Sequence, residues 1–256
     1  MGAPYIDYII ADATVAPDPS AFDEALCLLP DVYQPTSALP LGVDPGTRPD
    51  HGLPADAFVF CCFCNNWKIT PEVFAIWMRL LSQTPHSVIW LLANNTSVTA
   101  NLRREASAAG IDAERLEFAP RVDHGRHMAR HALADLALDT FPYGAHTTAS
   151  DAIRVGVPLI TRSGRSFQSR VARSVLAAAG LQQLAVDTPE AYEALALLLA
   201  RDPARLADVR AAVARAASSP LFDAGRFARN LEAGYEAMRE RWRSGLAPDT
   251  VFVRGQ

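Results

Sequence analysis

The chain has 256 residues and a mass of 27.7 kDa, enough for one large domain or two small ones. Hydrophobic residues make up 50% and charged residues 20%, a balance that excludes a disordered, collagen-like or coiled-coil chain. A net charge of −4 without a basic tail disfavours nucleic acid as a partner. The sequence contains neither a membrane-span-length apolar run nor the pattern of a secretion signal, so we expect no membrane contact and a cytoplasmic location.

Prolines break the first 55 residues into pieces too short to form a domain. Only the segment 5–11 predicts a strand, and a lone strand needs neighbours that this sequence does not visibly supply. We therefore expect this region to be the end of a preceding lobe and a proline-rich linker.

Short apolar runs then alternate with longer helical patterns, which is typical of β-α-β units and a parallel sheet. The predicted strands are 58–64, 87–92, 116–119, 136–140, 158–161 and 184–185. The predicted helices are 71–84, 96–109, 125–131, 147–155, 167–179, 189–201 and 224–244, the last followed by a short irregular tail. This order predicts an α/β fold with a doubly wound, Rossmann-like parallel sheet.

Three of the four cysteines lie in the predicted strand 58–64, where Cys61 and Cys64 form a C-x-x-C pattern. Three residues of strand separate their Cα atoms by about 10 Å. A disulfide requires less than about 7 Å. We therefore expect reduced cysteines in a core strand.

Lys68 is the one lysine among 24 basic residues. In a sequence rich in alanine and arginine, a retained lysine indicates a position that requires a compact, rotatable charge, although one lysine can also survive by chance. Lys68 follows the strand 58–64 and precedes a helix. It therefore belongs at the carboxyl end of a strand, where ligands of doubly wound sheets bind.

A second candidate site lies at 136–151, where a buried strand enters a proline- and glycine-containing turn before a helix opens with His146, Thr147 and Thr148. The free N–H groups at a helix start suit a phosphate, and the threonine hydroxyls add donors. Asp151, one turn further, is placed to accept hydrogen bonds from sugar hydroxyls. The alternative is ordinary helix capping by one of the threonines.

The segment 120–131 holds His124, His127 and His131 at helical spacing, so zinc is an alternative. No cysteine or carboxylate with ligand spacing joins them, and we expect no metal. An imidazole and a guanidinium of this segment can instead bracket a nucleobase. The sequence also lacks the glycine-rich phosphate loops and the D-x-D pair of metal-dependent nucleotide-sugar binding.

Four segments in order carry a resemblance to a known family: GAPYIDYII at 2–10, FCNNWKI at 63–69, AHTTASD at 145–151 and SPLFD at 219–223. Together they resemble the C-terminal catalytic region of O-linked N-acetylglucosamine (O-GlcNAc) transferases, in the bacterial, SPINDLY-like branch. The resemblance implies the donor-binding lobe of a GT-B glycosyltransferase. It also implies inverting, metal-independent transfer from UDP-N-acetylglucosamine to serine or threonine hydroxyls of a protein acceptor.

The resemblance assigns roles at the phosphates. It implies that Lys68 is catalytic, contacting the diphosphate and stabilising the leaving UDP, and that Asn65 also faces the donor phosphates. It implies that His146, Thr147 and Thr148 bind phosphate at the helix start.

The resemblance also assigns roles at the nucleoside. Asp151 would bind the ribose, and His127 would stack on uracil. Arg130 would lie against the base edge, and the backbone near Val122 would read the base. The resemblance implies no definite role for His124.

Members of this family carry tetratricopeptide repeats and an N-terminal catalytic lobe before the region resembled. We therefore expect 1–55 to be the end of that lobe plus a linker, 56–218 the nucleotide-sugar-binding lobe, and 219–256 a C-terminal helix and tail. We also expect this chain to transfer no sugar without the missing lobe. Two alternatives stay open: a non-catalytic UDP-sugar-binding module, and a related protein O-glycosyltransferase that uses another nucleotide sugar.

Overall fold

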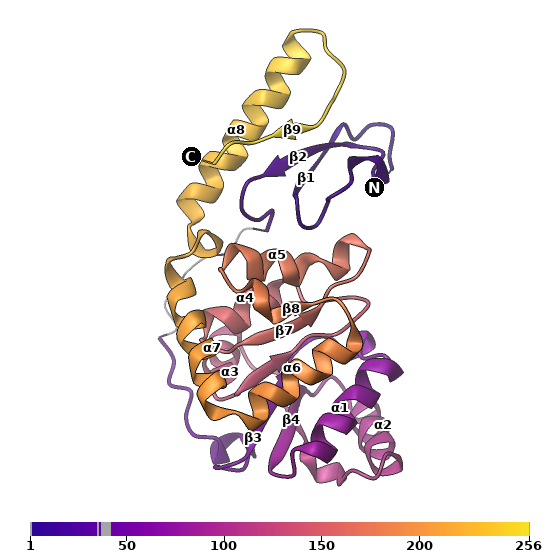
Figure 1. Ribbon diagram of the computed structural model, residues 1–256, viewed down its shortest axis with the longest axis vertical. Helices are drawn as coiled ribbons and strands as arrows, with labels where there is room; N and C mark the ends of the chain where they lie inside the picture. The colour runs from indigo at the N-terminus through magenta and orange to yellow at the C-terminus, as the bar shows by residue number, and fades with distance from the viewer. Residues whose placement is uncertain (1, 35, 37–41, 256) are drawn as a thin grey trace.

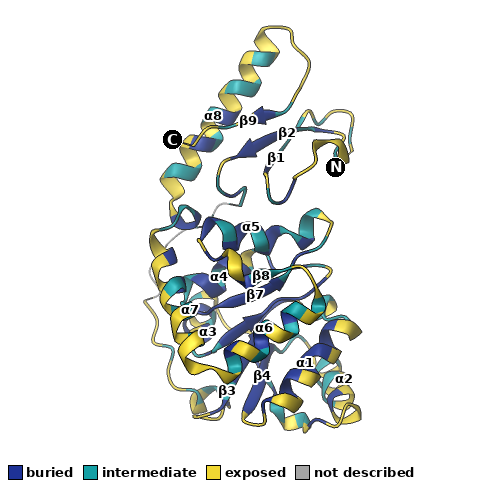
Figure 2. Cartoon of the chain, viewed as in Figure 1, coloured by how far each residue is buried: buried dark blue, intermediate teal, exposed yellow. Residues whose placement is uncertain are grey.

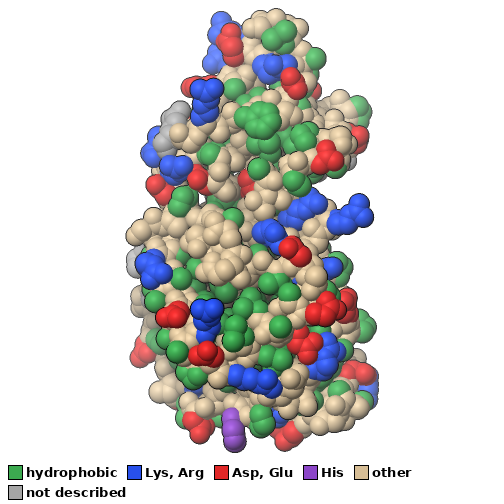
Figure 3. All heavy atoms as spheres, viewed as in Figure 1, with side chains coloured by type: hydrophobic (Ala, Val, Ile, Leu, Met, Phe, Trp, Pro, Cys, Tyr) green, Lys and Arg blue, Asp and Glu red, His purple; other side chains and the backbone are tan. Residues whose placement is uncertain are grey.

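The computed structural model describes residues 2–34, 36 and 42–255, which contain two parallel sheets (Figure 1). The larger sheet and its helices form the lower part of the view, and the smaller sheet lies above them beside the C-terminal helix. On the face shown in Figure 3, basic and acidic side chains are interspersed.

The larger sheet has six parallel strands in the order β5-β4-β3-β6-β7-β8. Near-continuous apolar runs form these strands because parallel sheets are buried on both faces, as the dark strands of Figure 2 show. The strands are β3 (Phe58–Cys62), β4 (Ser87–Leu92), β5 (Leu116–Ala119), β6 (Leu136–Leu138), β7 (Leu159–Arg162) and β8 (Ala185–Val186). The predicted doubly wound sheet is confirmed, with β3 and β6 each ending two residues earlier than predicted.

The strand order defines a switch point between β3 and β6. From β3 the chain adds β4 and β5 on one side, and it then returns to add β6, β7 and β8 on the other. Ligands of doubly wound sheets bind outside the carboxyl ends of the strands at such a point. The loops that follow β3 and β6 are therefore the first place to look for a site.

Eight α-helices are present in the described part of the chain. They are α1 (Pro71–Gln83), α2 (Thr96–Ala108), α3 (His124–His131), α4 (Thr147–Arg154), α5 (Val171–Ala178), α6 (Pro189–Arg201), α7 (Pro203–Arg215) and α8 (Ala224–Arg243). Right-handed crossovers in opposite directions place α1 and α4 on opposite faces of the sheet. α1 packs against α6, and α4 packs against α5.

The smaller sheet corrects the prediction for both ends of the chain. β1 (Tyr8–Asp12), β2 (Ala25–Leu29) and β9 (Val251–Phe252) pair in parallel in the order β1-β2-β9. The prediction that the N-terminal strand finds no visible neighbour is therefore wrong, and the tail is not wholly irregular. The pairs join residues far apart in sequence, and β9 is too short to be recognised from its pattern. α8 covers one face of this sheet, with Phe227 and Met238 against Cys27, Leu29 and Val251.

One polar contact joins the smaller sheet to the larger lobe, and another joins it to α8. Asp12, at the end of β1, accepts a hydrogen bond of 2.6 Å from the hydroxyl of Ser174 on α5. Asp31, just after β2, pairs at 2.6 Å with Arg226 on α8. The two segments that were predicted as separate ends, around β1 and after 219, thus meet in one unit.

Two further expectations concern cysteines and membranes. All four cysteines are free and buried, so the prediction of reduced cysteines is confirmed. Among the helices described here, none has the length and apolar character needed to cross a membrane.

Candidate functional site

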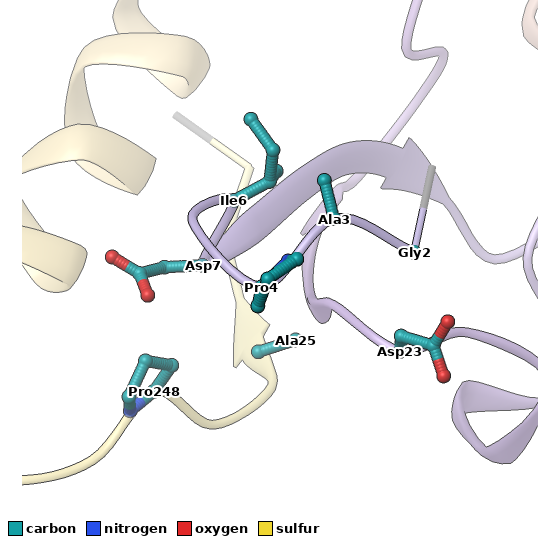
Figure 4. A pocket seen from close by; sticks show the side chains of 8 residues that line it. All are labelled: Gly2, Ala3, Pro4, Ile6, Asp7, Asp23, Ala25 and Pro248. Atoms are coloured by element: carbon teal, nitrogen blue, oxygen red, sulfur yellow. The ribbon is translucent and has the colours of Figure 1, made fainter.

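An open groove of about 390 Å³ lies at the amino ends of β1 and β2, lined in part by Asp7, Asp23 and Pro248 (Figure 4). Ligands of parallel sheets bind at the carboxyl ends, where the following helices direct their N–H groups. This groove is at the opposite ends of its strands. It is therefore not the site that the sequence predicts.

Lys68 lies at the switch point of the larger sheet. A short 3-10 turn, Asn66–Lys68, follows β3 and carries the lysine beyond the carboxyl end of the strand. Its Nζ donates a hydrogen bond of 2.8 Å to the carbonyl of Gly144, which lies between β6 and α4. Because β3 pairs directly with β6, the loops that follow these two neighbouring strands lie together.

The start of α4 is open. His146 occupies the N-cap position but makes no side-chain capping hydrogen bond. By contrast, side chains cap α1, α2, α3, α6, α7 and α8. Thr147 is exposed, and the Thr148 hydroxyl lies 3.5 Å from Cys64 Sγ. Neither threonine is the cap, so the alternative of ordinary capping is wrong, and no side chain caps the first N–H groups of α4.

Aromatic rings surround the Lys68 ammonium. Its Nζ lies 4.1 Å from the ring centroid of Tyr143 and 5.7 Å from that of Trp67. The ring of Tyr143 stacks on that of His146 with a centroid distance of 5.3 Å. Burial lowers the pKa of His146, and the charge of Lys68 lowers it further. The open helix start is thus flanked by one cation and by a neutral imidazole.

The loop from β5 to α3 brings a second group of predicted residues to the same side. His127 Nδ1 lies 3.0 Å from an N–H of Arg130, so this nitrogen accepts and the imidazole is neutral. Burial, aided by the charge of Arg130, lowers the pKa of His127 to about 4. Arg130 is 2% exposed and also donates to the carbonyl of Pro120. It therefore lies beneath His127, where it orients the ring.

Strand β3 connects these two groups. The ring of Phe63 meets the edges of His127 and His131 at centroid distances of 4.8 and 4.9 Å. The next residue, Cys64, contacts Thr148 on α4. The two residues that follow β3 thus contact α3 on one side and α4 on the other, so the predicted nucleoside and phosphate groups lie together outside the carboxyl ends of the strands, where a doubly wound sheet has its crevice.

The remaining predicted residues lie around this crevice. Asn65 is exposed at the start of the turn that carries Lys68, and Val122 is 40% exposed before α3. Asp151 is half-buried on α4, and burial raises its pKa, while the charges of His124 and Arg154 oppose the rise. The individual ligand contacts stay predictions.

Sequence reasoning missed three residues of the site. Asp139 is fully buried at the end of β6, Tyr143 covers Lys68, and Cys64 supports Thr148. The sequence feature that could have pointed to Asp139 is its position as an acidic residue directly after a buried strand. Cys64 was assigned to the core by its apolar neighbours. Hydrogen bonds from Cys62 and Thr148, together with the charge of Lys68, lower the pKa of its thiol.

The histidines of α3 bear on the zinc alternative. His131 is buried, and both of its ring nitrogens lack a hydrogen-bond partner among the described residues. Within residues 2–34, 36 and 42–255, no group of three or more His, Cys, Asp or Glu side chains is arranged to hold a metal ion. The absence of a metal requirement stays a prediction.

The fold and the crevice define the class of the protein. The α/β fold with its doubly wound parallel sheet is shared with solved structures of GT-B glycosyltransferases. A Thermobaculum terrenum O-GlcNAc transferase mutant has a TM-score of 0.80 and 33% sequence identity over 93% of this chain and 45% of that one. The pneumococcal O-GlcNAc transferase GtfA, solved with UDP and GlcNAc, shares the fold, with a TM-score of 0.57, 14% identity and coverage of 90% of this chain and 45% of that one.

Residues 36–231 match the model of Glycosyl transferase family 41, and the chain belongs to this family. The chain is also 35% identical over 262 residues to the probable UDP-N-acetylglucosamine–peptide N-acetylglucosaminyltransferase SEC of Arabidopsis thaliana. That match covers 98% of this chain but 27% of the plant protein, so the chain spans about a quarter of its length. The predicted resemblance to O-GlcNAc transferases is confirmed.

Proposed function

We propose that this chain is the donor-binding region of a protein O-GlcNAc transferase. It binds UDP-N-acetylglucosamine and takes part in inverting, metal-independent transfer of the sugar to serine or threonine hydroxyls of proteins. The observation that carries the proposal is the Lys68 ammonium beside the open start of α4, at the switch point of the sheet. The names of the family relatives support the donor and the protein acceptor.

The proposed mechanism rests on charge. As the glycosidic bond breaks, negative charge grows on the β-phosphate, and a cation held nearby favours the transition state. Lys68 supplies the cation, and the N–H groups of α4 add donors with the positive end of the helix dipole. His127 is neutral and presents a flat ring to the base, and Asp151 accepts from the ribose hydroxyls.

Several parts of the proposal concern the whole protein. In the proposal, transfer depends on an N-terminal catalytic lobe, and tetratricopeptide repeats are a further partner; the chain's span of 27% of the SEC relative leaves room for both. Metal independence is proposed because the sequence has no D-x-D pair and Lys68 can meet the diphosphate charge. A cytoplasmic location is also proposed, in keeping with four free cysteines.

Calorimetric titration with UDP in the presence of a chelator tests the donor site. We expect saturable binding by the wild-type chain and weaker binding by Lys68→Ala. Arg201→Ala is the matched control, since Arg201 also donates at 2.8 Å to a carbonyl, that of Gln83, away from the crevice. Its UDP affinity should equal that of the wild type.

The ligands of the titration separate the alternatives. Binding of GDP in preference to UDP would replace the proposed donor with another nucleotide sugar. No binding of either nucleotide by a folded chain would contradict the proposal. If a supplied N-terminal lobe restores no transfer although UDP binds, the chain is a non-catalytic module.

A further inference from the structure

Asp139 is the most tightly held carboxylate of the crevice. It is 0% exposed at the carboxyl end of β6. One carboxylate oxygen accepts the backbone N–H groups of Thr140 at 2.7 Å and Ala145 at 2.6 Å. The other accepts the hydroxyl of Thr161, on β7, at 2.6 Å. The side chain thus closes the loop from β6 to α4 and ties it to the adjacent strand.

The same side chain lies under Gly144, whose carbonyl receives Lys68. A Cβ at Gly144 would lie 3.1 Å from the Asp139 carboxylate and 3.3 Å from the carbonyl of Gln168. Only a residue without a side chain fits there comfortably, so the loop passes close over the carboxylate. An unbroken chain of contacts therefore runs from Thr161 through Asp139 and Ala145 to Gly144 and Lys68.

We infer that Asp139 is a positioning residue for the donor site: by holding Ala145 N–H and lying under Gly144, it sets the carbonyl that holds the Lys68 ammonium and the direction in which α4 opens. The inference rests on the proposed function, since it concerns the same UDP-sugar site. Asp139 itself is buried and acts through the loop.

The protonation state fits this role. Burial raises the pKa of Asp139 to about 8, and Cys64 raises it further, while the hydrogen bonds from Thr161, Thr140 and Ala145 oppose the rise. The other titratable groups that face this part of the core are Cys62 on β3 and Tyr192 on α6, and Tyr192 donates to the Asp139 carbonyl at 2.9 Å. Burial thus favours the uncharged form of the side chain, while the three hydrogen bonds that hold the loop favour the charged form.

The chain offers a matched control in Asp12. It is 2% exposed at the end of β1 and accepts the N–H groups of Thr14, Val15 and Tyr33 at 2.9 to 3.0 Å. It also accepts the Ser174 hydroxyl at 2.6 Å. Asp12 thus accepts four hydrogen bonds and Asp139 accepts three, but the loop that Asp12 holds contains none of the residues assigned to the crevice.

Two measurements on Asp139→Ala, Asp139→Asn and Asp12→Ala test the inference. The first is UDP affinity by calorimetry, and the second is the acetylation rate of Lys68, the one lysine of the chain, by peptide mass spectrometry. For Asp139→Ala we expect UDP affinity to fall about tenfold and Lys68 acetylation to rise severalfold, because buried N–H groups lose their acceptor and the loop moves. Asp139→Asn keeps the acceptor oxygen and should stay within about threefold of the wild type, and Asp12→Ala should change neither readout.

The outcomes distinguish this inference from the proposed function. If the wild-type chain fails to bind UDP, the proposed function fails, and Lys68 acetylation still decides the role of Asp139. Equal Lys68 acetylation in Asp139→Ala and the wild type would overturn the inference, as would an equal change in Asp12→Ala. If Asp139→Ala does not fold, Thr161→Val removes one of the three hydrogen bonds instead, and an unchanged acetylation rate in that variant overturns the inference.

Discussion

The two parallel sheets of this protein share one structural feature, a buried aspartate that accepts hydrogen bonds, but the feature has a different role in each sheet. Each has a buried aspartate at the carboxyl end of a strand, Asp12 after β1 and Asp139 after β6, and each aspartate accepts backbone N–H groups and a hydroxyl from a neighbouring element. In the smaller sheet this feature joins two layers of the fold. In the larger sheet it shapes a loop that meets Lys68 and an uncapped helix.

The comparison shows that burial and hydrogen bonding do not by themselves mark a functional residue. What differs is the surroundings of the loop. The larger sheet has a switch point between β3 and β6. The loops that follow these two strands lead to helices on opposite faces of the sheet, and ligands of doubly wound sheets bind between such loops. The strands of the smaller sheet run into loops that pack against α5 and α8.

Lys68→Ala has the largest expected effect on function. Within an intact enzyme, we expect a loss of about 10² to 10³ in kcat, the usual scale for removing a group that stabilises transition-state charge. Initial rates at saturating donor measure it, with Arg201→Ala as the control. A rate within tenfold of the wild type would contradict the proposed role of Lys68. It would also weaken the conclusion that the larger sheet, unlike the smaller one, forms the functional site.

Asp12→Ala should be the largest perturbation of stability in the smaller sheet. One buried and two partly buried N–H groups and one buried hydroxyl lose their acceptor, so we expect the free energy of unfolding to fall by about 2 to 4 kcal/mol. Urea unfolding followed by circular dichroism measures the change. A lowered UDP affinity in the folded variant would show that the smaller sheet also shapes the donor site.

The pH dependence of stability should distinguish Asp139 from its asparagine variant. The pKa of Asp139 is raised from 3.8 to about 8 in the folded chain, so the folded state binds more protons than the unfolded state between these values. The free energy of unfolding must therefore fall as pH rises from 4 to 8, by at most about 1.4 kcal/mol per pH unit, relative to Asp139→Asn. Urea titrations of both proteins at pH 5.5, 6.5 and 7.5 measure the difference, and parallel curves would contradict the assignment.

The smallest expected effects compare two helix starts. Thr188 caps α6 through its hydroxyl, whereas Thr147 begins α4 without capping it. Thr188→Ala should cost about 1 kcal/mol of stability and leave UDP affinity unchanged. Thr147→Ala should leave stability unchanged and weaken UDP binding about three- to tenfold. Thermal unfolding measures the stability of both variants, and calorimetry measures their UDP affinity. A loss of stability without a loss of UDP affinity in Thr147→Ala would show that Thr147 caps α4.

The larger sheet and most of its helices are predictable from the amino-acid sequence alone. Apolar runs and helical spacing are local signals, and capping residues such as Thr70 and Thr188 mark helix starts within one turn, so predicted ends differ from the structure by few residues. The sequence also points to Lys68, because the scarcity of lysine and a position after a strand are visible without coordinates.

The smaller sheet and the role of Asp139 depend on contacts between segments that are distant in the sequence. Pairing of β2 with β9 joins Cys27 to Val251, and no local pattern records a partner so distant. The role of Asp139 depends on a hydroxyl from another strand and on a glycine that passes over it. Periodicity reports which face of an element is buried, whereas the hydrogen-bond partners of a buried polar group depend on which elements meet there.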